Sequence, residues 1–345
     1  MSRKESEKQV RALDSSEFNK LGTLDDKIEF VLNYAVLAPS THNSQPWLFR
    51  VQDNKCYLEY NEDINIVYGD PQKRDLFISL GCCLENIIVA AKHFGIYSSY
   101  KYVKEGGNTV AEVAFIDSED NIKKDPHGLF NAIKNRFNSR SIYKDKNVPL
   151  SFLEEAVQLN NTAGMQIKFI RDKTKINDIS QLTADAVKEA YRDPLFRKEM
   201  SQWINSNFTS KRAGMPGYSL GVNTPLSVVL PYIIRSVNIG NKIGKLCSDV
   251  ISSAPYLCVI TSDTNSKEDW LNSGRLAERL MLFFNKNGLN TSIYVASLEI
   301  GDVHKKVKNV IGGEKIPHFI FAVGYADSVD SFSPRHPVKS KLVTV

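Results

Sequence analysis

The sequence predicts an α+β protein that consists of two related halves in one chain. Short runs with strand-like composition are joined by turn-like links, and longer segments carry apolar residues at helical spacing. The order of these elements in the first part of the chain recurs in the second, although few residues are repeated. We therefore divide the chain into a polar leader and two halves, over residues 1–23, 24–124 and 125–345.

The first half is expected to place a long apolar helix beside a group of short strands. Residues 74–94 carry a single apolar stripe, and Gly95 follows as a stop signal. In chain order, the predicted elements are a helix over 24–37, strands over 48–51 and 56–60 with a turn at 52–55, the helix over 74–94, and strands over 98–103 and 109–116.

The second half is expected to repeat this order around one long insertion. The predicted elements are a helical segment ending in 135–143, a helix over 150–159, strands over 166–170 and 256–261, a helix over 273–287 and a strand over 319–325. Residues 183–246 have no counterpart in the first half and contain several turn signals. Because long insertions in compact folds are usually functional, we expect this one to be a lid.

Composition and charge argue against several classes of protein. The chain has 345 residues and a net charge of +5, and no Lys/Arg run is interleaved with aromatic residues, which argues against nucleic-acid binding. The N-terminus lacks an apolar signal region, and no uninterrupted apolar stretch is long enough to span a membrane. Five scattered cysteines without a CxxC pattern indicate reduced thiols. We expect a cytoplasmic protein with neither a nucleic-acid nor a membrane partner.

The segment PSTHNSQPW, residues 39–47, follows a predicted helix and precedes a predicted strand; we call it the PSTHNSQPW loop. It is dense in hydroxyl and amide groups and has a proline near each end, so it presents several hydrogen-bonding groups at fixed positions. Such a loop is suited to recognition of a flat polar ring. The alternative is an ordinary helix-to-strand connection with Asx and Ser turns, in which Trp47 belongs to the core.

The segment RFNSR, residues 136–140, lies at the end of a predicted helical segment. Arg136 and Arg140 are four residues apart and share one helical face if the helix continues through them. Two arginines placed in this way can bind a phosphate or an anionic ring through charge-assisted hydrogen bonds. The alternative is a solvated basic face, which is the commoner outcome for an isolated pair of arginines.

These two segments resemble the nitroreductase family, in which an R-x-[ST]-x-[RK] segment near a helix and a PSxxNxQPW segment contact flavin mononucleotide (FMN). In that family they come from different subunits of a homodimer, whereas here one lies in each half of a single chain. The resemblance implies a nitroreductase-like fold with two pseudosymmetric halves, each with a mainly antiparallel sheet flanked by helices. Further segments resemble the Acg-like branch, which carries a D-P-x-x-R-[ED] segment before a long helix; they are residues 70–95, 273–299, 316–328 and 333–338.

The resemblance also implies one complete FMN site per chain, held between the halves. The second half has LNNTAG where the PSTHNSQPW pattern would recur, so the counterpart site has decayed. Asn138 stands where the family more often has a hydroxyl residue. The implied FMN contacts are Pro39, Ser40, Thr41 and Asn43 from the loop, Arg136, Asn138 and Arg335 at the phosphate, Arg140 at N1 and C2=O of the flavin, and Ser297 and Leu298 beside N5.

The implied function is an FMN-dependent oxidoreductase that passes electrons from NAD(P)H to nitroaromatic, quinone or similar acceptors in a ping-pong cycle. We nominate no side chain as a catalytic acid or base, because the flavin carries the chemistry. The alternative is an FMN storage or sequestration protein, with the insertion closed over the flavin and little turnover. Because the family dimer is fused here, we expect a monomer to suffice for FMN binding.

Other kinds of site are not supported by the sequence. The six histidines lack HExxH or paired metal spacing, so no metal site is expected. Residues 240–245 have too few residues between their glycines for a P-loop, and Leu246 stands where Ser or Thr would bind Mg²⁺. No GxGxxG follows a strand, so a Rossmann domain is not predicted. Cys82 and Cys83 are expected to be inert core thiols.

Overall fold

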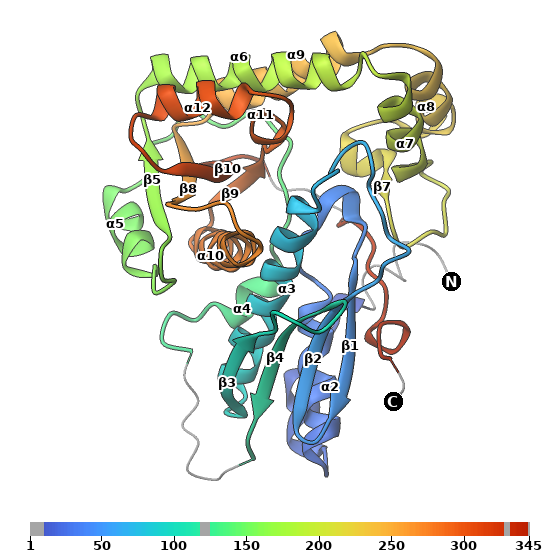
Figure 1. Cartoon of the computed structure of the whole chain (residues 1–345), viewed down its shortest axis with the longest axis vertical. Coiled ribbons are helices and arrows are strands. Elements are labelled where there is room, and N and C mark those ends of the chain that lie inside the picture. The colour runs from blue at the N-terminus through green and yellow to red at the C-terminus, as the bar shows by residue number, and fades with distance from the viewer. Residues whose placement is uncertain (1–9, 118–124, 328–331, 344–345) are drawn as a thin grey trace.

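The structure is a computed structural model that describes residues 10–117, 125–327 and 332–343. Two four-stranded sheets and two long helices that pack on each other form its centre (Figure 1). All neighbouring strands within these two sheets are antiparallel. The predicted α+β class is therefore confirmed.

The first half contains one sheet and the helix predicted over 74–94. Asp53 and Asn54 join the first two strands with left-handed backbone torsions, which tight two-residue hairpin turns require. The sheet has the order β1-β2-β4-β3. The elements are α2 (Leu24–Ala35), β1 (Trp47–Gln52), β2 (Lys55–Tyr60), α3 (Arg74–His93), β3 (Tyr97–Tyr102) and β4 (Thr109–Phe115).

The second half repeats this arrangement. Its sheet has the order β5-β8-β10-β9. In both sheets, therefore, the first, second, fourth and third strands along the chain follow one another across the sheet. Its elements are α5 (Leu150–Gln158), β5 (Gln166–Ile170), β8 (Tyr256–Ser262), α10 (Lys267–Lys286), β9 (Asn290–Ile293) and β10 (Ile316–Gly324). The recurrence of elements that the sequence indicates is therefore present in space, although the sequence did not reveal β9.

Helices α3 and α10 cross at the centre of the molecule, and a glycine of each lies at the crossing. A Cβ atom on Gly81 would collide with the backbone oxygen of Leu271, and one on Gly274 would collide with the backbone oxygen of Ile78. Glycine is needed at both positions, because neither backbone can move away from a side chain there. Each glycine faces the residue three positions before the other glycine, which is the relation that a two-fold axis produces.

An insertion with no counterpart in the first half connects β5 to β8. Helices α6 and α9 pack on each other over the second sheet, and α7 and α8 extend beyond it (Figure 1). Thr183 and Leu246, the predicted limits of the insertion, lie inside α6 and α9. Its elements are α6 (Lys173–Ala190), α7 (Pro194–Trp203), β6 (Ile204–Asn205), β7 (Met215–Pro216), α8 (Thr224–Ser236) and α9 (Gly240–Ser253).

The prediction of a helix that ends in residues 135–143 is wrong. Helix α4 (Phe130–Ile133) has only four residues, and the chain then runs without helix through residues 136–140. The Ser139 N–H donates to the Thr291 carbonyl at 2.8 Å, so this segment pairs with the edge of β9 instead of continuing the helix. Two short helices between β9 and β10, α11 (Ala296–Glu299) and α12 (Val303–Ile311), were also not predicted.

The described part of the polar leader packs against the first half. Residues Ser15–Lys20 form a 3₁₀ helix, and Phe18 within it is buried. Its ring stacks on that of Phe94, with 4.2 Å between the ring centroids. Val10, Leu13 and Leu21 also pack against the core, so several apolar side chains hold this segment in place.

Among the described residues, α3 is the one helix long and apolar enough to cross a membrane. Its most apolar stretch is 89% buried inside the protein, which is the position of a core helix. Cys82 and Cys83 lie on it, and burial raises the pKa of both thiols well above the usual value. Both cysteines are unpaired and buried, as expected for inert core thiols.

Candidate functional site

The PSTHNSQPW loop forms a tight connection between α2 and β1. His42, Asn43 and Gln45 all have positive φ angles, of 52°, 57° and 53°, which few residues other than glycine adopt. The hydroxyl of Ser40 accepts a hydrogen bond from the Gln45 N–H at 2.9 Å and closes the loop. Trp47 is fully buried, so it belongs to the core, as the simpler interpretation of the loop required.

The C-terminal arm brings Arg335 against this loop. Its guanidinium donates to Oδ1 of Asn43 at 2.7 Å and to the carbonyls of Leu37 and Ala38 at 3.4 and 3.1 Å. Burial lowers the pKa of Arg335 to about 9, and the charge of Arg136 acts in the same direction. Arg335 Nε has no hydrogen-bond partner within the described residues.

Arg136 reaches the same place from the second half. Its Nη2 donates to the Leu37 carbonyl at 3.2 Å, so two arginines hold one carbonyl oxygen. Its Nε lies 3.1 Å from Oε1 of Glu278 on α10, yet the atoms are not aligned for a hydrogen bond. Burial raises the pKa of Glu278 to about 6, although Arg136 and Arg335 oppose the shift. We call Glu278, Arg136 and Arg335 the Glu278 corner; when Glu278 is ionised, the corner has two cations and one anion.

The side chains of Asn138 and Arg140 contact residues outside the Glu278 corner. Oδ1 of Asn138 accepts a hydrogen bond from the Ile293 N–H at 2.7 Å, so this side chain holds the end of β9. The Arg140 side chain is exposed and contacts Sδ of Met215 in the insertion at 3.8 Å. Because Arg136 is buried and Arg140 is exposed, the shared helical face predicted for them is wrong, and the two do not form a single clamp.

The charge of Arg140 influences titratable groups from several parts of the chain. Its charge acts on His42 in the loop, on Tyr191 after α6, and on Tyr294 after β9. Burial lowers the pKa of His42 to about 4, with Arg140 contributing, so His42 is neutral at pH 7. No carboxylate pairs with Arg140 in the part of the chain that the structure describes. An exposed arginine without a carboxylate partner is suited to bind an anionic group of a ligand.

A group of three carboxylates and one arginine contacts the loop at Thr41, and none of its four members was predicted as a site residue. Nη1 of Arg74 lies 2.9 Å from Asp75 Oδ1 and 3.7 Å from Glu299 Oε1. Burial raises the pKa of Asp70 to about 7, and burial raises that of Glu299 well above its usual value. Oγ1 of Thr41 donates to Asp75 at 3.5 Å. The available signal was the segment DPQKRD, which we had used only as part of the family resemblance.

Ser297 and Leu298 lie in α11 and are buried. The hydroxyl of Thr183 donates to that of Ser297 at 3.2 Å, so α6 holds α11 in place. The Leu298 N–H donates to the Val295 carbonyl at 2.7 Å. In the loop itself, Pro39, Ser40 and Thr41 are half-buried, whereas Asn43 is buried.

The insertion is hydrogen-bonded to the loop. Nδ2 of Asn43 donates to the carbonyls of Arg212 and Gly214 at 3.2 and 3.0 Å, and Nε2 of Gln45 donates to that of Arg212 at 2.7 Å. Glu199 of α7 makes a second attachment, because its carboxylate accepts three backbone hydrogen bonds. The donors are the N–H groups of Val67, Tyr68 and Gly69, at 2.6, 3.0 and 2.8 Å.

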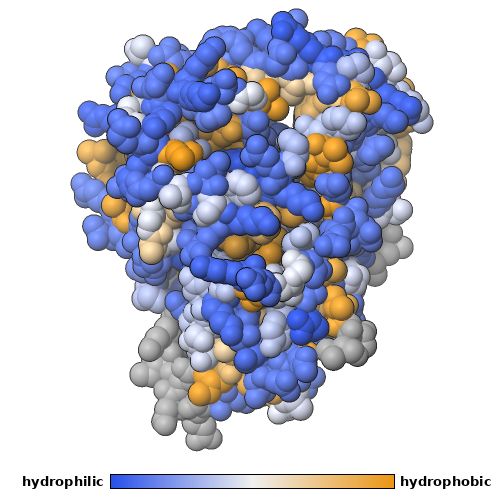
Figure 2. All heavy atoms as spheres, viewed as in Figure 1, coloured by the Kyte–Doolittle hydropathy of each residue, from blue (hydrophilic) through white to orange (hydrophobic). Residues whose placement is uncertain are grey.

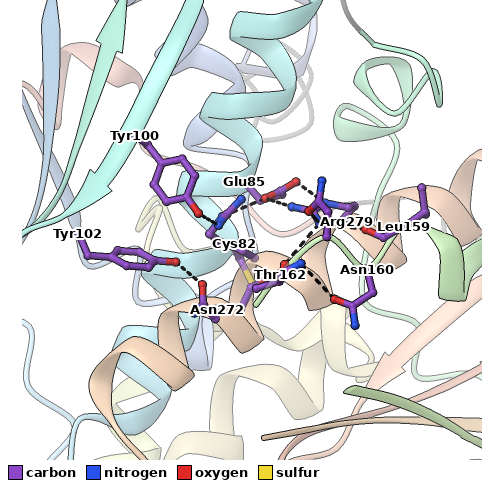
Figure 3. A network of polar contacts seen from close by, with 12 residues as sticks. Cys82, Glu85, Tyr100, Tyr102, Leu159, Asn160, Thr162, Asn272 and Arg279 are labelled. Carbon is purple, nitrogen blue, oxygen red and sulfur yellow. Dashed lines mark hydrogen bonds and ion pairs between the residues drawn. The ribbon is translucent and has the colours of Figure 1, made fainter. Parts of the chain in front are cut away.

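The opposite side of the α3–α10 crossing carries a closed polar network (Figure 3). Glu85 lies four residues after Gly81, as Glu278 lies four after Gly274, and it pairs with Arg275 and Arg279 at 3.2 and 2.6 Å. Burial opposes its ionisation, yet the two arginines lower its pKa below the usual value. We call Glu85 and these arginines the Glu85 corner. Arg279 also donates to the backbone and side chains of residues 159–162, at the start of the decayed counterpart loop.

No protein-family model matches the chain. Two relatives, "Putative NAD(P)H nitroreductase Rv3131" and "Putative NAD(P)H nitroreductase MT3217", come from the Mycobacterium tuberculosis strains H37Rv and CDC 1551. Each is 22% identical over 307 residues, which cover 87% of this chain and 86% of the relative.

Solved structures show weaker likenesses. Iodotyrosine deiodinase bound to FMN and 3-iodo-L-tyrosine is 18% identical, over 60% of this chain and 95% of that chain, with a TM-score of 0.39. The FMN-dependent nitroreductase NfnB from Mycobacterium smegmatis, in complex with NADPH, is 14% identical, over 62% of this chain and 96% of that chain, with a TM-score of 0.40. At these TM-scores the solved structures do not establish a shared activity.

Proposed function

Because the chain belongs to the nitroreductase family, we propose that it is an FMN-dependent oxidoreductase with NAD(P)H as its electron donor. The acceptor is a nitroaromatic, a quinone or a similar small molecule, reduced in the second half of a ping-pong cycle. One observation carries the proposal: Arg136 and Arg335 of the second half both donate to the carbonyl of Leu37, two residues before the PSTHNSQPW loop, and Arg335 also donates to Asn43 within the loop.

The residues at this place fit the chemistry of FMN. A flavin phosphate is dianionic, and the Glu278 corner holds two guanidinium groups against one carboxylate. Among the described residues, Arg136 and Arg335 keep nitrogens without a hydrogen-bond partner. Buried polar groups without partners are rare, so they indicate a place where a bound ligand completes the hydrogen bonding. FMN, when bound, supplies the two-electron redox chemistry. Arg140 provides the exposed cation that suits the N1 and C2=O edge of the flavin.

The other predicted contacts divide into binding and positioning roles in this proposal. Ser40 and Thr41 offer hydroxyl groups to the flavin from half-buried positions next to Pro39, and α11 brings Ser297 and Leu298 to its N5 side. Asn43 and Asn138 are positioning residues, because their side chains already bind other parts of the protein. Asn43 holds the insertion and Arg335, and Asn138 holds the end of β9.

Storage of FMN under a closed insertion is a second candidate function. The observation that favours it is the set of hydrogen bonds from Asn43, Gln45 and Glu199 that attach the insertion to the loop and to residues 67–69. A cover attached at two places limits the access of a nicotinamide ring to the flavin.

We also propose that one chain binds one FMN as a monomer, because both segments belong to the same chain. Size-exclusion chromatography of the loaded protein tests this.

Anaerobic reduction distinguishes the two candidates. The full-length protein is loaded with FMN, freed of excess flavin, and mixed with NADPH or NADH without oxygen. An oxidoreductase loses its yellow absorbance, and menadione or a nitroaromatic then restores it. Flavin that stays yellow with both donors, but bleaches with dithionite, supports storage. A protein that does not retain FMN at all contradicts both candidates.

A further inference from the structure

Helix α8 of the insertion exposes an apolar face. Val228, Val229 and Tyr232 lie on one side of this helix at spacings of three and four, with 45%, 46% and 71% of their surface exposed. Ser227 and Ile234 are buried on the opposite side, so α8 packs with its other face. Of the fourteen large hydrophobic residues exposed in the described chain, seven lie in residues 200–246, which marks this segment as unusual. Figure 2 shows hydrophobic surface at the corner where Figure 1 places α8.

The same segment carries charge of one sign. Residues 200–246 contain no Asp or Glu, and their cations are Lys211, Arg212, Arg235, Lys242 and Lys245. Arg235 is exposed and lies three residues after Tyr232, so it extends the exposed side of α8. Lys242, in the first turns of α9, is also exposed. Arg235 thus continues the exposed side of α8, and Asp249, the first acidic residue after the segment, already pairs with Lys245.

We propose that α8 docks this protein on an anionic lipid surface, with Val229 and Tyr232 entering the headgroup region and Arg235 and Lys242 binding acidic headgroups. Apolar side chains on one helix face and cations beside them are the two features that hold amphipathic helices in a membrane interface. A second copy of this face is a poor occupant, because it would set the same cations against each other. Tyr232 has the amphipathic ring that membrane interfaces favour.

This proposal revises one expectation from the sequence. We expected no membrane partner because no segment of the chain could span a bilayer, but a helix that lies in the interface need not be long or continuously apolar. α8 has thirteen residues and contains Pro231, so it could not cross a bilayer. The proposal does not depend on the flavin, and its test uses lipid binding alone.

Vesicle binding tests the proposal directly. The full-length protein is sedimented with vesicles of phosphatidylcholine, or of phosphatidylcholine with about one third phosphatidylglycerol, at about 50 and about 500 mM NaCl. We expect binding to the anionic vesicles at low salt, at least tenfold weaker binding to the neutral ones, and weaker binding at high salt. Absence of binding to anionic vesicles at low salt overturns the proposal.

Matched variants locate the surface. Val229→Ser should weaken anionic-vesicle binding severalfold, whereas Val157→Ser is the control, because Val157 is a helical valine with nearly the same exposure, 45%, in α5. Arg235→Gln and Lys242→Gln should each weaken binding about fivefold at low salt. Far-ultraviolet circular dichroism and thermal melts confirm that each variant is folded.

Two outcomes contradict the placement on α8. Equal loss of binding in Val157→Ser and Val229→Ser shows that the surface lies elsewhere. Sedimentation velocity without lipid tests whether a second copy of the chain occupies this face instead. If the wild-type protein is a dimer and Tyr232→Ser is a monomer, the face is a dimer interface and lipid docking is overturned. If Tyr232→Ser has the same self-association as the wild-type protein but no longer binds the anionic vesicles, the proposal is supported.

Discussion

The two corners of the α3–α10 crossing contain the same groups, one glutamate and two arginines, in different states. In the Glu85 corner both carboxylate oxygens are hydrogen-bonded, and the pKa of Glu85 is lowered. In the Glu278 corner the carboxylate has no aligned hydrogen bond within the described residues, and its pKa is raised to about 6. The polar composition of the two corners is alike, but only one is satisfied internally.

The origin of the arginines explains this difference. Arg275 and Arg279 stand on α10 itself, on one face and one turn apart, so the helix places both against Glu85. Arg136 and Arg335 come from a non-helical segment and from the C-terminal arm. Their hydrogen bonds go to the carbonyls of Leu37 and Ala38, which precede the loop, and to Asn43. Among the described residues, the Glu85 corner is therefore a closed ion network, whereas the Glu278 corner keeps donors without a hydrogen-bond partner.

The largest expected effect comes from removing one arginine from each corner, which tests whether the two corners differ in function. Arg136→Met and Arg279→Met should each destabilise the protein by about 3–5 kcal/mol at pH 8, because each weakens the pairing of a buried glutamate. Only Arg136→Met should also reduce FMN affinity in the fraction that remains folded. Urea unfolding and flavin fluorescence titration measure the two effects. Equal loss of FMN affinity in both variants would break the functional distinction between the corners.

Arg140→Ala should affect the ligand and leave the fold unchanged. The side chain is exposed and has no carboxylate partner in the described chain, so its removal should change stability little. Loss of a charge-assisted hydrogen bond should weaken FMN binding by about 1.5–3 kcal/mol, or roughly 10- to 150-fold. Arg192→Ala, in an exposed pair with Glu189, is the control and should bind FMN normally. Unchanged FMN binding in Arg140→Ala argues against this placement of the flavin.

The carboxylates near Thr41 should make the stability of the folded protein depend on pH. The pKa of Asp70 is raised to about 7 by burial, so protonation of Asp70 stabilises the folded state; this contribution is complete below the usual value near 3.8 and is lost as pH rises through 7. Asp70→Asn should therefore increase stability at pH 8 by about 2 kcal/mol and have little effect at pH 4. Thermal melts across this range measure the difference.

The duplication provides the control for that experiment. Asp263 lies four residues before α10 as Asp70 lies four before α3, but it is largely exposed and pairs with Lys315 at 2.6 Å. Asp263→Asn should have no comparable pH dependence. If both variants respond to pH alike, burial is not the cause of the Asp70 effect.

The smallest effect concerns the attachment of the insertion. Glu199→Gln keeps the size of the side chain but removes the charge that strengthens three backbone hydrogen bonds, so global stability should fall by about 1 kcal/mol or less. Release of FMN, followed after dilution into apoflavodoxin, should become severalfold faster. Lys188→Gln in α6, which interacts with Asp185 on the surface, is the control. An unchanged release rate indicates that this attachment does not limit exit of the flavin.

Much of the fold follows from local patterns that the sequence shows directly. The apolar stripe of 74–94 and its stop at Gly95 predicted α3 to within one residue, and the strand at 166–170 was predicted with its observed limits. Such elements are visible because apolar periodicity and turn residues act over short distances. The helix through Arg136 failed for the opposite reason, since pairing of Ser139 with Thr291, far along the chain, decides the local conformation there.

The sequence by itself determined the fold class and the recurrence of the elements, and it selected the two segments that we propose to bind FMN. Only the tertiary structure decided the state of each charged group, because burial and partners set a pKa and these depend on residues far apart in sequence. Glu85 and Glu278 are the same residue type at the same place on related helices. Their surroundings, assembled from distant parts of the chain, leave one paired and the other incompletely satisfied.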